Sequence, residues 1–406
     1  CILIGRKAGE SINNDDAHYT VAIGSSAGAA ITSGQRNVAL GFNAGLETTI
    51  GDSNIAIGYQ ALVGDGAFQN DSNIAIGSSH PTGPVLGAMG GQWVTAASSE
   101  NIAIGTGSMS GAMNGALRNV AVGYKSLNAL TEGDHNNAFG HSALVALTTG
   151  GDNVAVGAYA GNSITTTGMN AFLGAAAGRY HQGGYNTAIG GECLVSYSSG
   201  TRDGQYNTAV GYRAMTCASA ALSGDNNVAV GYDSLKVLTS GDNNVAVGTG
   251  SGIAITTGGL NTIIGKNACD ALTTGAGNVV MGYDAFGACG LGASYNVILG
   301  YQAGNAITAT NANSNVIIGY NAGQGGSADW RYNVAIGANA LNSTGTNADT
   351  EGQVAIGYNA LTACTSGVRN IAMGSNSADA LTVGSDNLAI GYDAMGALST
   401  VASSQR

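Results

Sequence analysis

Charged side chains are scarce in this 406-residue chain: Asp, Glu, Lys and Arg together make up 9% of it, and aromatic residues make up 6%. Only two prolines occur, against 67 glycines. Nucleic-acid binding needs clustered basic residues, whereas this sequence has none and carries a formal net charge of −11. No apolar run reaches the roughly 18 residues that span a bilayer as a helix. We therefore expect no nucleic-acid partner and no membrane insertion.

Cysteine spacing gives no sign of a metal site or a redox motif, because no C-x-x-C pair is present. We interpret the six cysteines as small buried apolar residues and predict no disulfide within the chain. The sequence opens with Cys rather than Met, in the middle of a repeat, so we expect it to be part of a longer fibre chain.

The chain is built from one repeated motif, of which "NNVAVGYDSL" and "NNVAVGTGSG" are two copies seventeen residues apart. The glycine that ends each N-V-A-V-G recurs 22 times, and ten of the 21 intervals are 17 residues. These glycines are 5, 24, 41, 58, 77, 105, 123, 140, 157, 174, 190, 211, 231, 248, 265, 282, 300, 319, 337, 357, 374 and 391. A fixed short period indicates a solenoid, in which each repeat packs only on its neighbours.

Each repeat has room for short strands and turns but not for a helix. The residues of N-V-A-V-G alternate as in a strand, and a turn such as "LTTG" follows about ten residues later. We therefore predict an all-β fold, a parallel β-solenoid of about 22 coils that runs as one domain over 1–406. The longest interval, from Gly77 to Gly105, predicts a loop insertion at about 78–100.

An asparagine stands four residues before the glycine, at position −4, in 19 of the 22 copies. Amides at equivalent places in successive coils can donate to one neighbour and accept from the other. We predict such a structural ladder, with members that include Asn227, Asn244, Asn261 and Asn278.

The two faces of the strand differ in composition. Positions −3 and −1 are mostly Val or Ile and are predicted to form the coil interior, while −2, usually Ala, faces outward. Where −2 is large, an exposed apolar strip would result, and monomers seldom leave one uncovered. The candidate interface residues on this strip are Phe172, Ile263, Val280, Ile298 and Ile317.

Motifs that suggest chemistry have structural explanations. Tyrosine recurs at +1 in nine copies, and we favour a packing ladder over a platform for sugar rings. Aspartates in "GDNN" and "GDSN" fit turns better than calcium loops. The glycines are not followed by a helix as phosphate loops require, and no catalytic or metal-ligand grouping is evident. We predict no cofactor, no metal and no enzymatic activity.

The repeat N-[VIT]-A-[VIL]-G-x-x-[AS] resembles the N-S-V-A-I-G-x-x-S repeat of trimeric autotransporter adhesin heads, and similar repeats occur in tail fibres of tailed bacteriophages. The likeness covers nearly the whole chain, although the coil is longer than in that family. It implies a left-handed β-roll, a homotrimer and attachment to a surface. The implied location is extracellular, on a virion or, alternatively, on a bacterial cell surface.

Three functions fit these observations. We favour a phage tail fibre that binds a host receptor or glycan; the alternatives are a bacterial adhesin head and, from another class, a β-helical polysaccharide depolymerase. Recognition is predicted on loops that protrude from the longer coils. The candidate ligand-binding residues are His80, Trp93, Trp330 and Arg331.

Overall fold

The computed structural model describes residues 1–12, 17–64, 69–79, 86–91, 96–197, 202–217, 221–326, 329–342 and 350–397. The chain divides into two compact units. Unit 1 comprises Cys1–Val195 and Arg202–Gly204, and unit 2 comprises Ser196–Thr201 and Gln205–Arg406. The proposed insertion at 78–100 falls in unit 1, and its residues 80–85 and 92–95 lie outside the described residues.

Both units contain short β-strands joined by turns, and neither has an α-helix in its described residues. The strands of unit 1 are β1 (Ile2–Ile4), β2 (Val21–Ile23), β3 (Val38–Leu40), β4 (Ile55–Ile57), β5 (Ile74–Ile76), β6 (Ile102–Ile104), β7 (Val120–Val122), β8 (Asn137–Phe139), β9 (Val154–Val156), β10 (Ala171–Leu173) and β11 (Thr187–Ile189). Those of unit 2 are β12 (Thr208–Val210), β13 (Val228–Val230), β14 (Val245–Val247), β15 (Thr262–Ile264), β16 (Val279–Met281), β17 (Val297–Leu299), β18 (Val316–Ile318), β19 (Trp330–Arg331), β20 (Val334–Ile336), β21 (Thr350–Glu351), β22 (Val354–Ile356), β23 (Ile371–Met373) and β24 (Leu388–Ile390).

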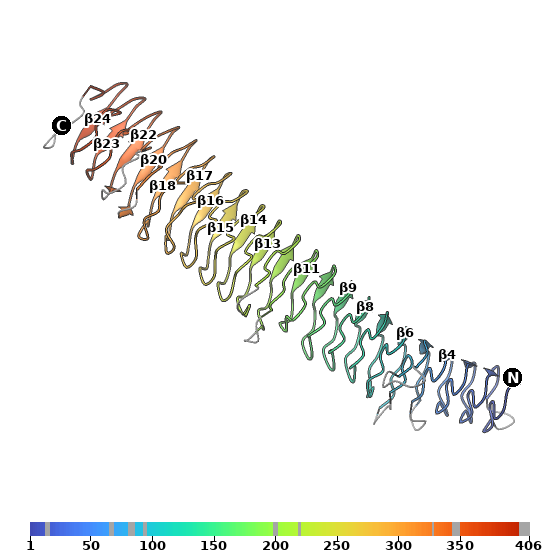
Figure 1. Ribbon diagram of the computed structural model, residues 1–406. Coiled ribbons are helices and arrows are strands. Elements are labelled where there is room, and N and C mark those ends of the chain that lie inside the picture. The colour runs from blue at the N-terminus through green and yellow to red at the C-terminus, as the bar shows by residue number, and fades with distance from the viewer. Residues whose placement is uncertain are drawn as a thin grey trace. The chain divides into compact units, whose positions relative to one another are not determined.

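Within each unit the three-residue strands stack in parallel, one from each coil (Figure 1). The register aligns equivalent repeat positions: in β13 and β14, Val228 pairs with Val245 and Val230 with Val247. The chain therefore forms the predicted all-β parallel solenoid with a period of about 17 residues. Its hand stays a prediction.

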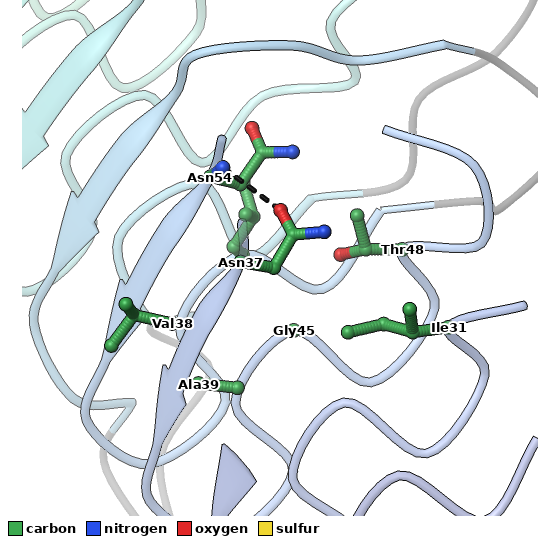
Figure 2. Close-up of a pocket in the computed structure, with 8 residues that line it drawn as sticks. Ile31, Asn37, Val38, Ala39, Gly45, Thr48 and Asn54 are labelled. Carbon is green, nitrogen blue, oxygen red and sulfur yellow. Dashed lines mark hydrogen bonds between the residues drawn. The ribbon is translucent and has the colours of Figure 1, made fainter. Parts of the chain in front are cut away.

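The predicted inside and outside of the strand are reversed. Position −2 is the buried one: Ala229 and Ala246 have no exposed area, while the residues at −3 and −1 of the same strands are partly exposed. Figure 2 shows this arrangement in β3, where Ala39 points into the coil and Val38 points away from it. The expected strip of exposed −2 side chains is therefore wrong. Its five candidate interface residues have no exposed area and belong to the coil core: Phe172, Ile263, Val280, Ile298 and Ile317.

Large side chains at −2 fill space that glycines leave at +4. The Phe172 ring lies where a Cβ on Gly161 or Gly178 would stand, with nearest approaches of 2.8 and 2.6 Å. Ile317 fills the space beside Gly323 in the same way, at 2.9 Å. Most other coils combine Ala at −2 with Leu or a similar side chain at +4. In these coils a large side chain at one of the two positions is matched by a small one at the other, as close packing requires.

The coil of Gly41 lacks this compensation. Gly45 is combined with Ala39, and Thr48 stands where other coils have Leu or Ile, which leaves a cavity of about 10 Å³ (Figure 2). The cavity is also lined by Ile31 and Leu62.

The glycine that defines the repeat allows the coils to approach closely. Gly248 has a φ of +134°, and a Cβ on it would lie 2.5 Å from the carbonyl oxygen of Gly265 in the next coil. Any other residue would both strain the backbone and collide with the next coil. This explains why the motif always ends in glycine.

Asparagine side chains at −4 form a buried ladder. The Nδ2 of Asn244 donates to Oδ1 of Asn227 at 3.0 Å, and that of Asn261 donates to Asn244 at 3.0 Å. Asn278 continues the row by donating to Asn261 at 2.9 Å. Each Oδ1 also accepts the backbone N–H of the next asparagine, as between Asn244 and Asn227 at 2.9 Å. The ladder satisfies buried amides in the turn before each strand, which an apolar side chain would leave unpaired.

Candidate functional surfaces

Two of the four predicted ligand-binding residues, His80 and Trp93, lie outside the described residues. The expectation that Trp330 sits on a protruding loop is wrong, because it has no exposed area and pairs with Thr350 between β19 and β21. Its ring fills the space beside Gly326, where a Cβ would approach it to 2.6 Å. Arg331 is half-buried and pairs with Asp329 at 2.8 Å and with Glu351 at 3.9 Å.

The outer face of the sheet is apolar and open. Each three-residue strand presents its −3 and −1 side chains there, and most of these are Val, Ile or Leu. Val156 is 41% exposed in unit 1, and Val279 and Met281 are 37% and 42% exposed in unit 2. We call this surface the outer sheet face; it consists of the −3 and −1 residues of a unit's three-residue strands.

The size of this face can be estimated from one unit. Full burial of a Val, Leu or Ile side chain corresponds to about 60–120 Å² at 25 cal/mol per Å². With roughly a third of that area open on each of two side chains per strand, eleven strands leave about 400–900 Å². The largest apolar patch of a typical monomer is about 300–600 Å². The outer sheet face of either unit alone therefore overlaps that range and extends beyond its upper end.

Aromatic residues at +1 stack beside this face. In unit 2 the rings of Tyr283 and Tyr301 lie 5.2 Å apart, those of Tyr301 and Tyr320 lie 5.5 Å apart, and both pairs are inclined by only 13°. In unit 1 Phe42 stacks on Tyr59 at 5.4 Å. Because stacked rings cover one another's faces, their exposed parts are edges and hydroxyls. This favours the packing ladder over a platform on which sugar rings could lie.

A second row on unit 1 combines aromatic rings with cations. Tyr124 and His141 stack at 5.2 Å, and His141 meets Tyr159 at 4.9 Å. The Lys125 ammonium lies 5.4 Å from the Tyr124 ring, and the Arg179 guanidinium lies 4.8 Å from that of Tyr159. We call these five residues the cationic row.

Turn aspartates act within the fold. Asp225 accepts the backbone N–H of Gln205 at 2.7 Å, and its own N–H donates to Asp242 at 2.8 Å. Asp52 and Asp71 are linked in the same way at 2.7 Å. Each carboxylate accepts a backbone N–H of the neighbouring coil where no backbone carbonyl does so. This role explains why aspartate recurs at the turn. Among the described residues no three His, Cys, Asp or Glu side chains are grouped to hold a metal ion.

One acidic pair is close enough for its charges to interact. Burial, and then the nearby Asp284 carboxylate, raise the pKa of Asp270. Asp284 accepts hydrogen bonds from the amides of Gln302 at 3.1 Å and Asn305 at 2.6 Å. Two carboxylates with amide donors form a polar surface cluster but not a complete cation site.

Threonines of the "LTTG" turns are also used inside the fold. The hydroxyl of Thr239 donates to the carbonyl of Thr256 at 2.9 Å, and that of Thr256 donates to Thr273 at 3.2 Å. These hydroxyls form a threonine ladder between coils. Sequence reasoning missed both this ladder and the cationic row. The Thr ladder had a signal, because Thr recurs eight residues after the repeat glycine. The cationic row had only a weak one, since Lys125 and Arg179 occupy different repeat positions.

No protein-family model matches the chain, and no curated protein matches it. The described residues include no helix of the length and hydropathy that crossing a membrane would take. The resemblance to adhesin heads and tail fibres therefore rests on the repeat motif, and the structure shows only that the fold is a β-solenoid.

Proposed function

We propose that this protein is a structural fibre protein that attaches a particle or a cell to a surface, and that it acts as a phage tail fibre. The alternative in the same class is the head of a bacterial adhesin, on the cell surface. The outer sheet face is the observation that carries the proposal. Coils that repeat one apolar outer surface can pack side by side with those of other copies of the chain. The surface left uncovered in such an assembly would then be available for attachment.

The proposal includes a homotrimer in which the outer sheet faces cover one another. The face of one unit is comparable to the roughly 800 Å² that each partner buries in a standard interface. Its contact residues would be those at −3 and −1, such as Val156 and Met281, instead of the buried −2 residues. A lone chain would leave this face in water.

The third candidate, a polysaccharide depolymerase, finds less support. Hydrolysis of a glycosidic bond ordinarily uses two carboxyl groups about 5–10 Å apart that flank the bond. The turn aspartates at positions such as Asp52, Asp225 and Asp242 are engaged with backbone N–H groups along the stack. We therefore propose a binding protein without catalytic activity.

The test of assembly is the mass of the protein in solution. Light scattering should report about three times the chain mass of 39.9 kDa. Met281→Lys, on the outer sheet face, should dissociate or loosen the assembly. Leu260→Lys is a matched control, because Leu260 is an exposed apolar residue, 65% accessible, in a turn outside that face. A folded monomer of the unmodified protein would rule out the trimer.

Attachment is tested separately. The purified protein should adsorb to host cells or to their extracted surface glycans, and incubation with those glycans should release no new reducing ends. Release of reducing ends would favour the depolymerase. Antibody labelling of phage particles and of bacterial surfaces would distinguish the tail fibre from the adhesin head.

A further inference from the structure

The cationic row holds two positive charges in place without neutralising them. Lys125 and Arg179 contact aromatic rings, and neither forms an ion pair with any residue that the structure describes. By contrast, Lys7 and Arg118 pair with Glu10 and Glu100. A cation on a ring keeps its full charge, and the contact restricts its side chain before any ligand arrives.

Arg179 is the better fixed of the two cations. Its guanidinium lies 4.8 Å from the Tyr159 ring and 4.6 Å from that of Tyr180, so it contacts two aromatic rings. Arginine also presents several N–H donors in one plane, an arrangement that matches a carboxylate or a sulfate.

The geometry of the row selects an extended ligand. Lys125 and Arg179 belong to coils three apart, those of Gly123 and Gly174, which at about 4.8 Å per coil separates them by roughly 14 Å along the stack. Their different repeat positions add to this separation. One small anion cannot touch both. Between them lie the partly exposed edges of Tyr124 and Tyr159, 41% and 37% accessible, and the exposed ring of His141. These offer hydroxyl and ring-nitrogen hydrogen-bonding groups along the line.

We propose that the cationic row binds an acidic oligosaccharide whose carboxylate or sulfate groups pair with Lys125 and Arg179 and whose hydroxyls bond to the tyrosines. This rests on the proposed attachment function and names its ligand class.

Single-stranded nucleic acid, the other extended polyanion, fits less well. Its binding depends on bases that stack on open aromatic faces and on a groove of several cations. Here the ring faces are taken by neighbouring rings and by the two cations.

The experiment measures binding of a hexamer of galacturonic acid, a sulfated hexasaccharide and a neutral hexamer of glucose by calorimetry on the full chain. At least one acidic hexamer should bind, more weakly as salt is raised, and the neutral one should not. The double variant Lys125→Gln/Arg179→Gln should lose at least tenfold in affinity with an unchanged melting temperature. Lys125→Gln alone, at the end of the row, provides a milder test if the double variant is destabilised.

Lys266→Gln is the matched control. Lys266 lies 5.9 Å from the Tyr283 ring at the end of the neutral ladder of unit 2, so its loss should leave the affinity unchanged. Equal binding of acidic and neutral hexamers, full affinity in the double variant, or tighter binding of a single-stranded oligonucleotide would each overturn the proposal. If the double variant no longer binds the acidic hexamer but the protein still attaches to cells, attachment uses another surface. If the unmodified protein does not attach at all, the proposed function fails independently of the row.

Discussion

The ring of Phe172 occupies the space that Gly178 leaves in the same coil. A Cβ on Gly178 would lie 2.6 Å from the ring, and several ring atoms are within 2.7 Å. Phe172 is completely buried, so the ring has nowhere to move. The two residues therefore form a volume-matched pair, and a change in one is not tolerated without a change in the other.

Replacement of Gly178 by alanine should destabilise the protein by about 1–3 kcal/mol, the usual range for overpacking a core. Gly45→Ala is the matched control. Gly45 has nearly the same φ, +58° against +63°, but its added Cβ would find its nearest neighbour 3.6 Å away, at the Ala39 Cβ. Denaturant unfolding of both variants separates the collision from the shared backbone strain. Equal losses would show that strain alone is responsible.

The asparagine ladder predicts an asymmetry between two substitutions of Asn244. Alanine removes the side-chain donors to Asn227 and to the carbonyl of Gly258. It also deprives the backbone N–H of Asn261 of its acceptor and leaves Nδ2 of Asn261 with the Gly275 carbonyl alone. A loss of several kcal/mol is expected, since each buried unpaired group costs about 1–3 kcal/mol. Glutamine should cost much less, because Gln353 already holds this position in its own coil and accepts the N–H of Asn370 at 3.0 Å. Thermal unfolding measures both, and equal melting temperatures would contradict the ladder's importance.

The reactivity of the thiols follows from burial. Burial raises the pKa of Cys193 to about 12 and that of Cys364 to about 11. Burial also raises the pKa of Cys269, and a hydrogen bond between this thiol and Cys289 adds to the effect. A higher pKa leaves less of the reactive thiolate. At pH 8 the native protein should therefore react rapidly with a thiol reagent only at the exposed Cys1.

All six thiols should react after denaturation, because all six cysteines are free in the structure. A smaller number would contradict the prediction that no disulfide forms. Cys269 and Cys289 are nevertheless closer than an extended strand allows, since the chain turns back between the two repeat positions.

The period and composition of the repeat were sufficient to predict the fold. A fixed interval places equivalent residues, such as the asparagines at −4, next to one another in successive coils, as a solenoid requires. The orientation of the strand could not be read from alternation, which distinguishes two faces but does not say which one is buried. The decisive signal lies in paired volumes: Phe172 with Gly161 and Gly178, or Ile317 with Gly323. Each of these pairs joins position −2 to position +4. The two positions can contact each other only when the −2 side chain points into the coil. Trp330 was misplaced for a related reason, since its coil length suggested a loop while its ring fills the core beside Gly326.

His181 predicts a loss of stability in mild acid. It stands at +7, where Leu130, Leu147 and other coils have an aliphatic side chain, and it has no exposed area. Its Nε2 lies 2.9 Å from the carbonyl oxygen of Gly204 and 3.1 Å from the Nδ2 of Asn186, while Nδ1 has no hydrogen-bond partner among the described residues. Burial lowers its pKa from 6.5 to about 4; the Gly204 bond and Asp203 oppose this shift, and Arg202 adds to it.

The sign follows from the protons bound in each state. Between pH 6.5 and about 4 the unfolded chain binds a proton at His181 and the folded one does not, so the stability that the neutral ring provides is present above pH 6.5 and declines as pH falls toward 4. The decline should reach about 2 kcal/mol by pH 5 and about 3 kcal/mol in full, at 1.36 kcal/mol per unit of pKa. His181→Leu restores the aliphatic column and should abolish this component, so the variant's free energy of unfolding should change less between pH 7.5 and pH 5. Parallel pH profiles for the two proteins would exclude His181 as the group responsible.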